Sequence, residues 1–244
     1  MQADTGRRHA VLAASILALG MLLGLAALGW LLGQSAIRVK EFERSVTVKG
    51  LAEKEFPADI VLWPIQFSRA DNDLGKLYAG LESDAGKIRR FLRGKGVENA
   101  EISLSPPQII DKLAQQYGGG QRAEFRYSGM QTLTVYSRNI DAVRKTQNQL
   151  SELGKQGIVF SGNDYQNATE YLFTRLNEVK PGMVEEATTK AREVAEKFAH
   201  DSNSTLGKIR RASQGQFSIS ARDRNNPHIK KVRVVSTVEY YLSD

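Results

Sequence analysis

Side chains that commonly catalyse reactions or hold metals are sparse in this sequence. The 244 residues include three histidines and no cysteine, which excludes disulfides, thiol catalysis, iron–sulfur clusters and thiolate zinc sites. His9 lies near the N-terminus, His200 at the expected end of a helix, and His228 in an Asn-Asn-Pro-His loop. Because a metal ion needs several converging ligands, these dispersed histidines predict no metal site and no cofactor.

Glycine-rich, serine and acidic motifs give no catalytic signal either. The run Tyr117-Gly-Gly-Gly-Gln121 lacks the lysine and following helix that a phosphate-binding loop requires, so we interpret it as the tip of a hairpin. No serine lies in a Gly-x-Ser-x-Gly motif. Glu185 and Glu186 are adjacent on an expected helix and do not face one site. The sequence therefore predicts a protein that is not an enzyme.

Positive charge is the remaining feature with a chemical meaning. The formal net charge is +7, which suits an anionic membrane surface or an acidic partner. A solvated surface, or cations matched to a helix dipole, is the competing interpretation. Nucleic acid is disfavoured because no basic strand carries interleaved aromatic residues. The candidate contacts with an anionic surface are Arg89, Arg90, Arg93, Lys230, Lys231 and Arg233.

An uncharged stretch near the N-terminus organises the rest of the chain. Ala10 to Gly33 has 24 residues without a charge, enough for a helix to cross the ~30 Å hydrocarbon core of a bilayer. Arg7 and Arg8 precede it and predict a cytoplasmic N-terminus, because Lys and Arg favour the cytoplasmic side. We expect a single-pass inner-membrane anchor with the C-terminal part in the periplasm.

The alternative is a cleaved signal peptide, since Gly33, Ser35 and Ala36 offer small residues for a cleavage site. Cleavage would release the protein into the periplasm. With an anchor, residues 1–9 are cytoplasmic, 10–33 span the membrane, 34–44 form a linker and 45–242 form one periplasmic domain. Its composition, 41% hydrophobic and 25% charged for the whole chain, is that of a folded protein.

Hydrophobic periodicity predicts an α+β domain with helices packed on mixed or antiparallel sheet. We expect Gly50 to end the first strand, and Pro64 to place the second strand at a sheet edge or at a bulge. Asp71, Asn72 or Asp73 is expected to cap the first helix, and Pro181 to occupy the first turn of the last helix. The order of elements suggests a distant internal repeat. The expected strands are Ser45–Gly50, Asp59–Phe67, Glu101–Ile110, Phe125–Tyr136, Ile158–Phe160, Thr169–Leu176, a segment through Ile209 and Ser220, and Lys231–Leu242; the expected helices run through Leu74–Leu92, Ile140–Leu153 and Val184–Ala199.

Several short motifs follow one another along the chain: Val46-Thr-Val-Lys-Gly50, Phe56-Pro-Ala-Asp59, Tyr127-Ser128 with Leu133-Thr-Val-Tyr136, Gly157-Ile158, the alanine-rich Glu185 to Ala199, and Leu206-Gly-Lys-Ile209. In this order they resemble the SIMPL-domain family of exported bacterial proteins, a domain of unknown function. Ala52 and Glu53 stand where the first motif usually has a second glycine. The resemblance implies a non-enzymatic envelope protein, similar in some members to oligomer-forming periplasmic proteins and associated in others with stress tolerance. The resemblance assigns no catalytic residue to any position of this chain.

Two functions remain open from the sequence. The first is an oligomeric structural or interaction module of the cell envelope, anchored in the inner membrane and connected with stress. The second is a periplasmic binder of a small hydrophobic or anionic ligand. A homo-oligomer and an anionic lipid or envelope partner are expected, and no nucleic acid.

Overall fold

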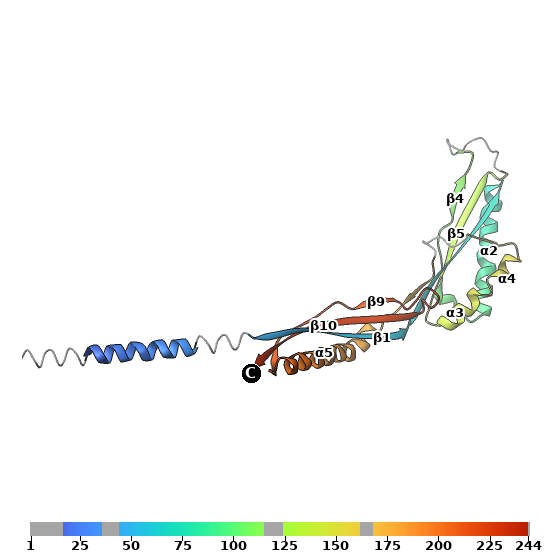
Figure 1. Cartoon of the computed structure of the whole chain (residues 1–244). Coiled ribbons are helices and arrows are strands. Elements are labelled where there is room, and N and C mark those ends of the chain that lie inside the picture. Colours follow the sequence, from blue (N-terminus) through green and yellow to red (C-terminus); the bar gives the residue numbers. More distant parts are fainter. Residues whose placement is uncertain (1–16, 36–43, 115–123, 162–167, 244) are drawn as a thin grey trace, which may run out of the picture. The chain divides into compact units, whose positions relative to one another are not determined.

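The fold is α+β, as the sequence predicts (Figure 1). The computed structural model describes residues 17–35, 44–114, 124–161 and 168–243, and the structural statements below concern those residues. Its strands are β1 (Ser45–Pro57), β2 (Ile60–Asp71), β3 (Ile102–Leu104), β4 (Gln108–Asp111), β5 (Tyr127–Ser137), β6 (Val159–Phe160), β7 (Glu170–Leu172), β8 (Thr205–Gln214), β9 (Ser218–Ala221) and β10 (Ile229–Ser243). Its helices are Leu17–Ser35, α2 (Leu74–Gly94), the short 3-10 helix η1 (Asn99–Glu101), α3 (Ile140–Gln147), α4 (Ser151–Gly154) and α5 (Leu176–Asp201).

The region expected to be one domain divides into two compact units with interleaved sequence. Unit 1 is formed by Met1–Ala52, Gly182–Gln216 and Val234–Asp244. Unit 2 is formed by Glu53–Pro181 and Phe217–Arg233. The long elements β1, α5 and β10 therefore contribute residues to both units.

Unit 2 holds a six-stranded sheet with the order β3-β5-β2-β6, in which β4 also pairs with β5 and β7 with β2. All these pairs are antiparallel. Helix α2 packs against β2 and β5 through an apolar stripe, as its spacing predicts, and forms one core with them. Asp73 caps this helix, because its side chain accepts a hydrogen bond from the Lys76 backbone N–H at 2.8 Å. The buried face of α2 consists of Leu77, Leu81, Asp84, Ala85, Ile88 and Leu92.

Pro64 does not place β2 at a sheet edge, and the register of β2 with β5 is continuous, without a bulge. On the other side of β2, β7 pairs only with Ile60–Leu62 and β6 only with Phe67–Ser68. Pro64 lies in the gap between these two short partners. A missing backbone donor is tolerated there because, on the side of β2 away from β5, no described strand pairs with Pro64.

Unit 1 packs α5 on β1 and β10, while β8 pairs antiparallel with β10. The core face of β10 is the one that alternation predicts, with Val238 and Tyr240 buried. Gly50 does not end β1, which continues to Pro57. Gly50 is instead buried where α5 crosses, and a Cβ atom there would lie 1.8 Å from the Ala187 carbonyl oxygen. Glycine is thus required by a close backbone approach and not by a turn.

Helix α5 begins earlier than expected, at Leu176, so Pro181 lies inside the helix and not in its first turn. Its missing N–H removes one intrahelical hydrogen bond near the N-terminal end. The expected apolar stripe is only partly buried. Met183, Ala187, Ala191, Ala195 and Ala199 are buried, whereas Val194 and Phe198 are exposed.

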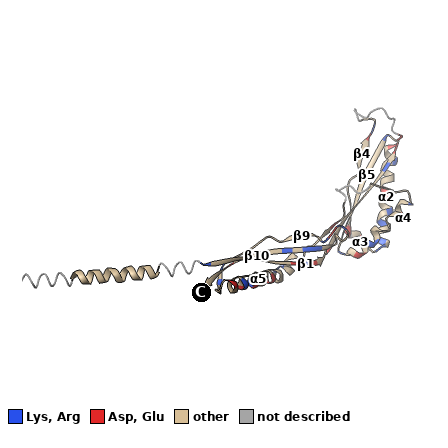
Figure 2. Cartoon of the chain, in the orientation of Figure 1, with Lys and Arg blue, Asp and Glu red and all other residues tan. Residues whose placement is uncertain are grey.

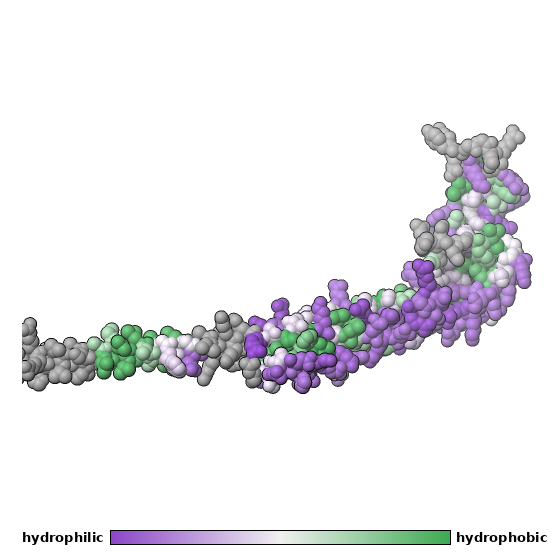
Figure 3. Space-filling view, viewed as in Figure 1, coloured by the Kyte–Doolittle hydropathy of each residue, from purple (hydrophilic) through white to green (hydrophobic). Residues whose placement is uncertain are grey.

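The predicted apolar segment forms a helix from Leu17 to Ser35. Residues 10–16 of that segment, with His9, Arg7 and Arg8, lie outside the described part of the chain, as does the glycine run at 118–120. The mean hydropathy of the helix is 1.8, and the described residues bury none of it. Figure 3 colours much of this helix green, as hydrophobic. By length and composition it is a candidate membrane span.

Candidate functional site

Three of the six predicted anion contacts meet in one surface pocket of unit 2. Helix α2 turns its apolar stripe toward the sheet, which leaves Arg89, Arg90 and Arg93 exposed on the other side. Figure 2 shows Lys and Arg in blue along this helix. The pocket has a volume of about 420 Å³. It is lined by Gly86, Arg89, Arg90, Arg93, Asn99 and Ile102.

Neighbouring cations on α2 have structural partners. Asp84 is buried, and its carboxylate pairs with Arg69 of β2 at 2.7 Å and with Lys87 at 3.4 Å. Lys95 pairs with Glu152 of α4 at 3.7 Å. These contacts hold α2 on the sheet and on α4, and so fix the position of the arginine pocket.

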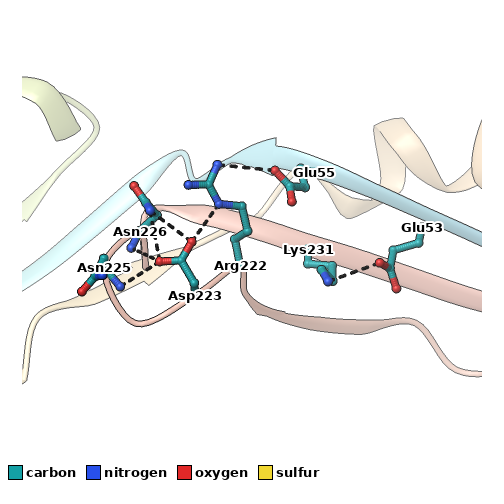
Figure 4. A network of polar contacts seen from close by, with 7 residues as sticks. All are labelled: Glu53, Glu55, Arg222, Asp223, Asn225, Asn226 and Lys231. Carbon is teal, nitrogen blue, oxygen red and sulfur yellow. Dashed lines mark hydrogen bonds and ion pairs between the residues drawn. The ribbon is translucent and has the colours of Figure 1, made fainter.

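The other three predicted contacts do not form one cluster. Alternation along β10 places Lys230 on the face of buried Val232, and Lys231 and Arg233 on the opposite face. The Lys231 ammonium pairs with Glu53 of β1 at 3.3 Å (Figure 4). Burial lowers the pKa of Lys230, and the charge of Glu170 acts in the opposite direction. An arrangement split over two faces is a poor contact for one anionic surface.

A polar network occupies the turn between β9 and β10 (Figure 4). The Arg222 side chain donates to Asp223 at 2.9 Å and lies 3.7 Å from Glu55. Asp223 also accepts hydrogen bonds from the backbone N–H groups of Asn225 and Asn226, both at 2.8 Å. The hydrogen bonds from Arg222 and then Asn226 lower the pKa of Asp223 to about 2. Sequence analysis did not single out Asp223, although the Asn-Asn-Pro run after it is a turn signal.

The two histidines in the described part of the chain, His200 and His228, have different surroundings. His228 packs edge-on against the Tyr171 ring, with 6.0 Å between centroids, and its Nδ1 is buried with no hydrogen-bond partner among the described residues. Burial and the positive charge of Arg144 lower the pKa of His228, which favours the neutral ring. His200 is exposed and lies 3.5 Å from Asp201. Among the described residues, no three His, Cys, Asp or Glu side chains are grouped to hold a metal ion.

Asp59, from the Phe56-Pro-Ala-Asp motif, has a structural role. Its carboxylate accepts hydrogen bonds from the backbone N–H of Thr174, at 2.8 Å, and from the Thr174 hydroxyl. Burial raises the pKa of Asp59, but these bonds and the nearby Arg175 outweigh burial and lower it. Phe56 and Phe173 stack at 5.4 Å between ring centroids. The motif thus fastens the start of β2 to the segment after β7.

Two comparisons with known proteins complete the description. Curated proteins give no match to this chain. The model of the SIMPL family, a protein family of unknown function (DUF541), matches residues 46–239, well over half of the chain. This range contains Gly50, Asp59 and the arginine pocket, and it follows the apolar helix. The chain is therefore a member of the SIMPL family.

Proposed function

We propose that this protein is a single-pass inner-membrane protein whose SIMPL domain lies in the periplasm. The observation in support is the apolar helix Leu17–Ser35, which no other part of the described chain buries. Its 19 residues extend about 28 Å at ~1.5 Å per residue, close to the ~30 Å bilayer core. The arginines at positions 7 and 8 support a cytoplasmic N-terminus.

The anchor is tested by fractionating cells that express the full chain. We expect the protein at its full mass in the membrane pellet after alkaline carbonate extraction. We also expect external protease to digest the SIMPL domain in spheroplasts but not in intact cells. A soluble periplasmic protein lacking its N-terminal segment would contradict the anchor and indicate a cleaved signal peptide.

We further propose that the domain is a non-enzymatic structural or interaction module that forms a homo-oligomer. Unit 1 supports this because β8 lies at the end of its sheet and pairs only with β10 among the described strands. Nine of its ten residues are exposed, and an open strand edge offers backbone N–H and C=O groups to another chain. Exposed Phe198 and Ile209 add apolar surface in the same unit.

Native mass spectrometry of the full chain, released from detergent over a range of concentrations, tests this proposal. We expect one defined oligomer, a shift to smaller species in Phe198→Glu, and no shift in the control Tyr136→Glu. Tyr136 is similarly exposed but belongs to unit 2. A monomer at every concentration would contradict the oligomer.

We propose a role in envelope maintenance under stress, which rests on the family resemblance alone. Deleting the gene should slow growth in detergent or at high osmolarity, and the wild-type gene should restore it. Unchanged growth in both conditions would contradict this role.

A further inference from the structure

The arginines of the α2 pocket have no anionic partner among the described residues, in contrast to several other arginines of the chain. Arg69, Arg126 and Arg222 each contact a carboxylate at 2.7 to 2.9 Å. No ion pair or hydrogen bond joins the side chains of the three pocket arginines to another described residue. Three guanidinium groups that line one pocket, with no carboxylate partner in the described part of the chain, repel one another. A bound anion would remove this repulsion.

The pocket brings together groups from three consecutive elements. Arg89 and Arg90 lie about one helical turn before Arg93. The Arg90 side chain reaches back along the helix, so that its Nη1 would lie 3.6 Å from a Cβ atom added at Gly86. Asn99 of η1 adds an amide, and Ile102 of β3 adds an apolar side chain.

A match to the helix dipole explains only part of this charge. The negative end of a helix dipole acts within the last turn, and Arg93 is the basic residue in the last turn of α2. Arg89 and Arg90 lie earlier. The carboxylate of Glu101, the acidic residue of η1, accepts the Glu98 backbone N–H at 2.9 Å and forms no ion pair with these arginines.

We propose that this pocket binds a phosphate group. Guanidinium groups offer paired N–H donors that match phosphate oxygens, and the Asn99 amide adds a further donor. The arginines are exposed and the pocket is open, so it suits the charged end of a larger molecule better than a fully enclosed solute. The same chemistry occurs in a phospholipid headgroup and in free phosphate. The proposal goes beyond the proposed function and does not depend on the oligomeric state.

The test uses the full chain in a neutral detergent, with calorimetric titration of two probes. One probe is inorganic phosphate, and the other is dihexanoyl phosphatidic acid below its micelle concentration. The variant is Arg89→Ser/Arg90→Ser/Arg93→Ser. The control is Lys76→Ser/Lys145→Ser/Lys155→Ser, which removes the same charge from exposed positions of unit 2.

We expect the control to bind within about twofold of wild type and the arginine variant to lose at least about tenfold in affinity, since charge-assisted hydrogen bonds are lost. Binding of both probes would support recognition of phosphate itself. Binding of the lipid alone would support the proposal with a lipid headgroup as its source. Equal losses in the variant and the control would overturn the proposal, because binding would then follow net charge. Failure of wild type to bind either probe would also overturn it.

Gly86 provides a second test that keeps all three arginines. Gly86→Glu places a carboxylate three and four residues before Arg89 and Arg90, where ion pairs form readily. We expect it to reduce binding as strongly as the triple variant. Gly182→Glu adds the same charge at an exposed position of α5 in unit 1, where an added Cβ meets no atom within 4 Å, and should bind like wild type. Circular dichroism melting checks that both variants fold. Unchanged binding by Gly86→Glu would overturn the proposal even if the triple variant fails to fold.

Discussion

The two long helices of the domain pack on their sheets in different ways. Helix α5 of unit 1 contacts its sheet through alanines at every fourth position, Ala187, Ala191, Ala195 and Ala199. Helix α2 of unit 2 uses large side chains, chiefly Leu77, Leu81, Ile88 and Leu92. Both stripes follow the helical period, but they bury side chains of very different size.

The difference shows two ways in which a helix can pack closely on a sheet: by close approach of the two backbones, or by burial of large side chains. In unit 1 the fit comes from the backbone, because Gly50 and the alanines let β1 and α5 approach closely. In unit 2 it comes from apolar side chains, each worth roughly 1.5–3 kcal/mol when buried. Unit 1 should therefore be most sensitive to added atoms, and unit 2 to removed atoms.

The largest effect is expected from Gly50→Ala in unit 1. The new Cβ would lie 1.8 Å from the Ala187 carbonyl oxygen and 2.4 Å from the Ala191 backbone nitrogen, so α5 must move. We expect a loss beyond the ~1–3 kcal/mol of ordinary overpacking. Hydrogen exchange measured by mass spectrometry should show lost protection in α5.

Gly86→Ala is the matched control, since the nearest atom to its Cβ is a side-chain nitrogen at 3.6 Å. Alanine is favoured over glycine inside a helix by up to ~1 kcal/mol, so this variant should be at least as stable as wild type. Equal stability of Gly50→Ala and wild type would refute the backbone fit of unit 1.

The next largest effect is expected from Leu92→Ala in unit 2. Leu92 is fully buried in the core under α2, and truncation leaves a cavity that costs ~2–5 kcal/mol. Chemical denaturation measures the loss of unfolding free energy. Leu74→Ala, at the partly exposed first residue of the same helix, should cost much less. A similar loss in both variants would argue against side-chain packing as the source of fit.

A smaller effect is expected from Asp84→Asn. This carboxylate is buried in the apolar face of α2 and pairs with Arg69 and Lys87. Neutralising it leaves polar groups incompletely paired and should cost ~1–3 kcal/mol; the exposure of Arg69 keeps the loss toward the lower end. The variant should also lose much of the salt dependence of unfolding, and a wild-type salt dependence would show that the pair contributes little.

The smallest effect concerns pH and the turn of unit 2. The pKa of Asp223 is about 2 in the folded protein, below its ordinary 3.8, so the unfolded chain takes up a proton first. The stabilisation from Asp223 is complete above about pH 4 and is lost as the pH falls toward about 2. Asp223→Asn should lower the melting temperature at neutral pH, and this deficit should shrink on acidification. A deficit that is independent of pH would exclude the charge of Asp223 as its cause.

Features that depend on neighbouring residues in the sequence could be predicted. Features that depend on contacts between distant segments were missed. The Asp73 cap depends on residues within one turn, so it could be predicted among three candidates. The role of Gly50 depends on a helix more than 130 positions later, and Pro64 is tolerated because of where β6 and β7 end. Neither fact is visible in local spacing.

The candidate site also has a part that local spacing predicts and a part that depends on distant segments. Helical spacing was enough to group Arg89, Arg90 and Arg93, and the structure adds Asn99 and Ile102. The partner of Lys231 was not predicted because Glu53 comes from a strand at the other end of the domain. Whether the arginines bind an anion remains a prediction.

The interleaving of the two units has a consequence for how the chain reaches its final state. The sheet of unit 1 pairs β1 with β10, which lie near opposite ends of the domain sequence. A chain threaded across a membrane from its N-terminal side lacks β10 until the last residues emerge. Closing so long a loop is slow compared with forming local contacts. If the domain is exported as we propose, unit 1 therefore completes its folding only after transport has ended, and the earlier segments stay without their β10 partner until then.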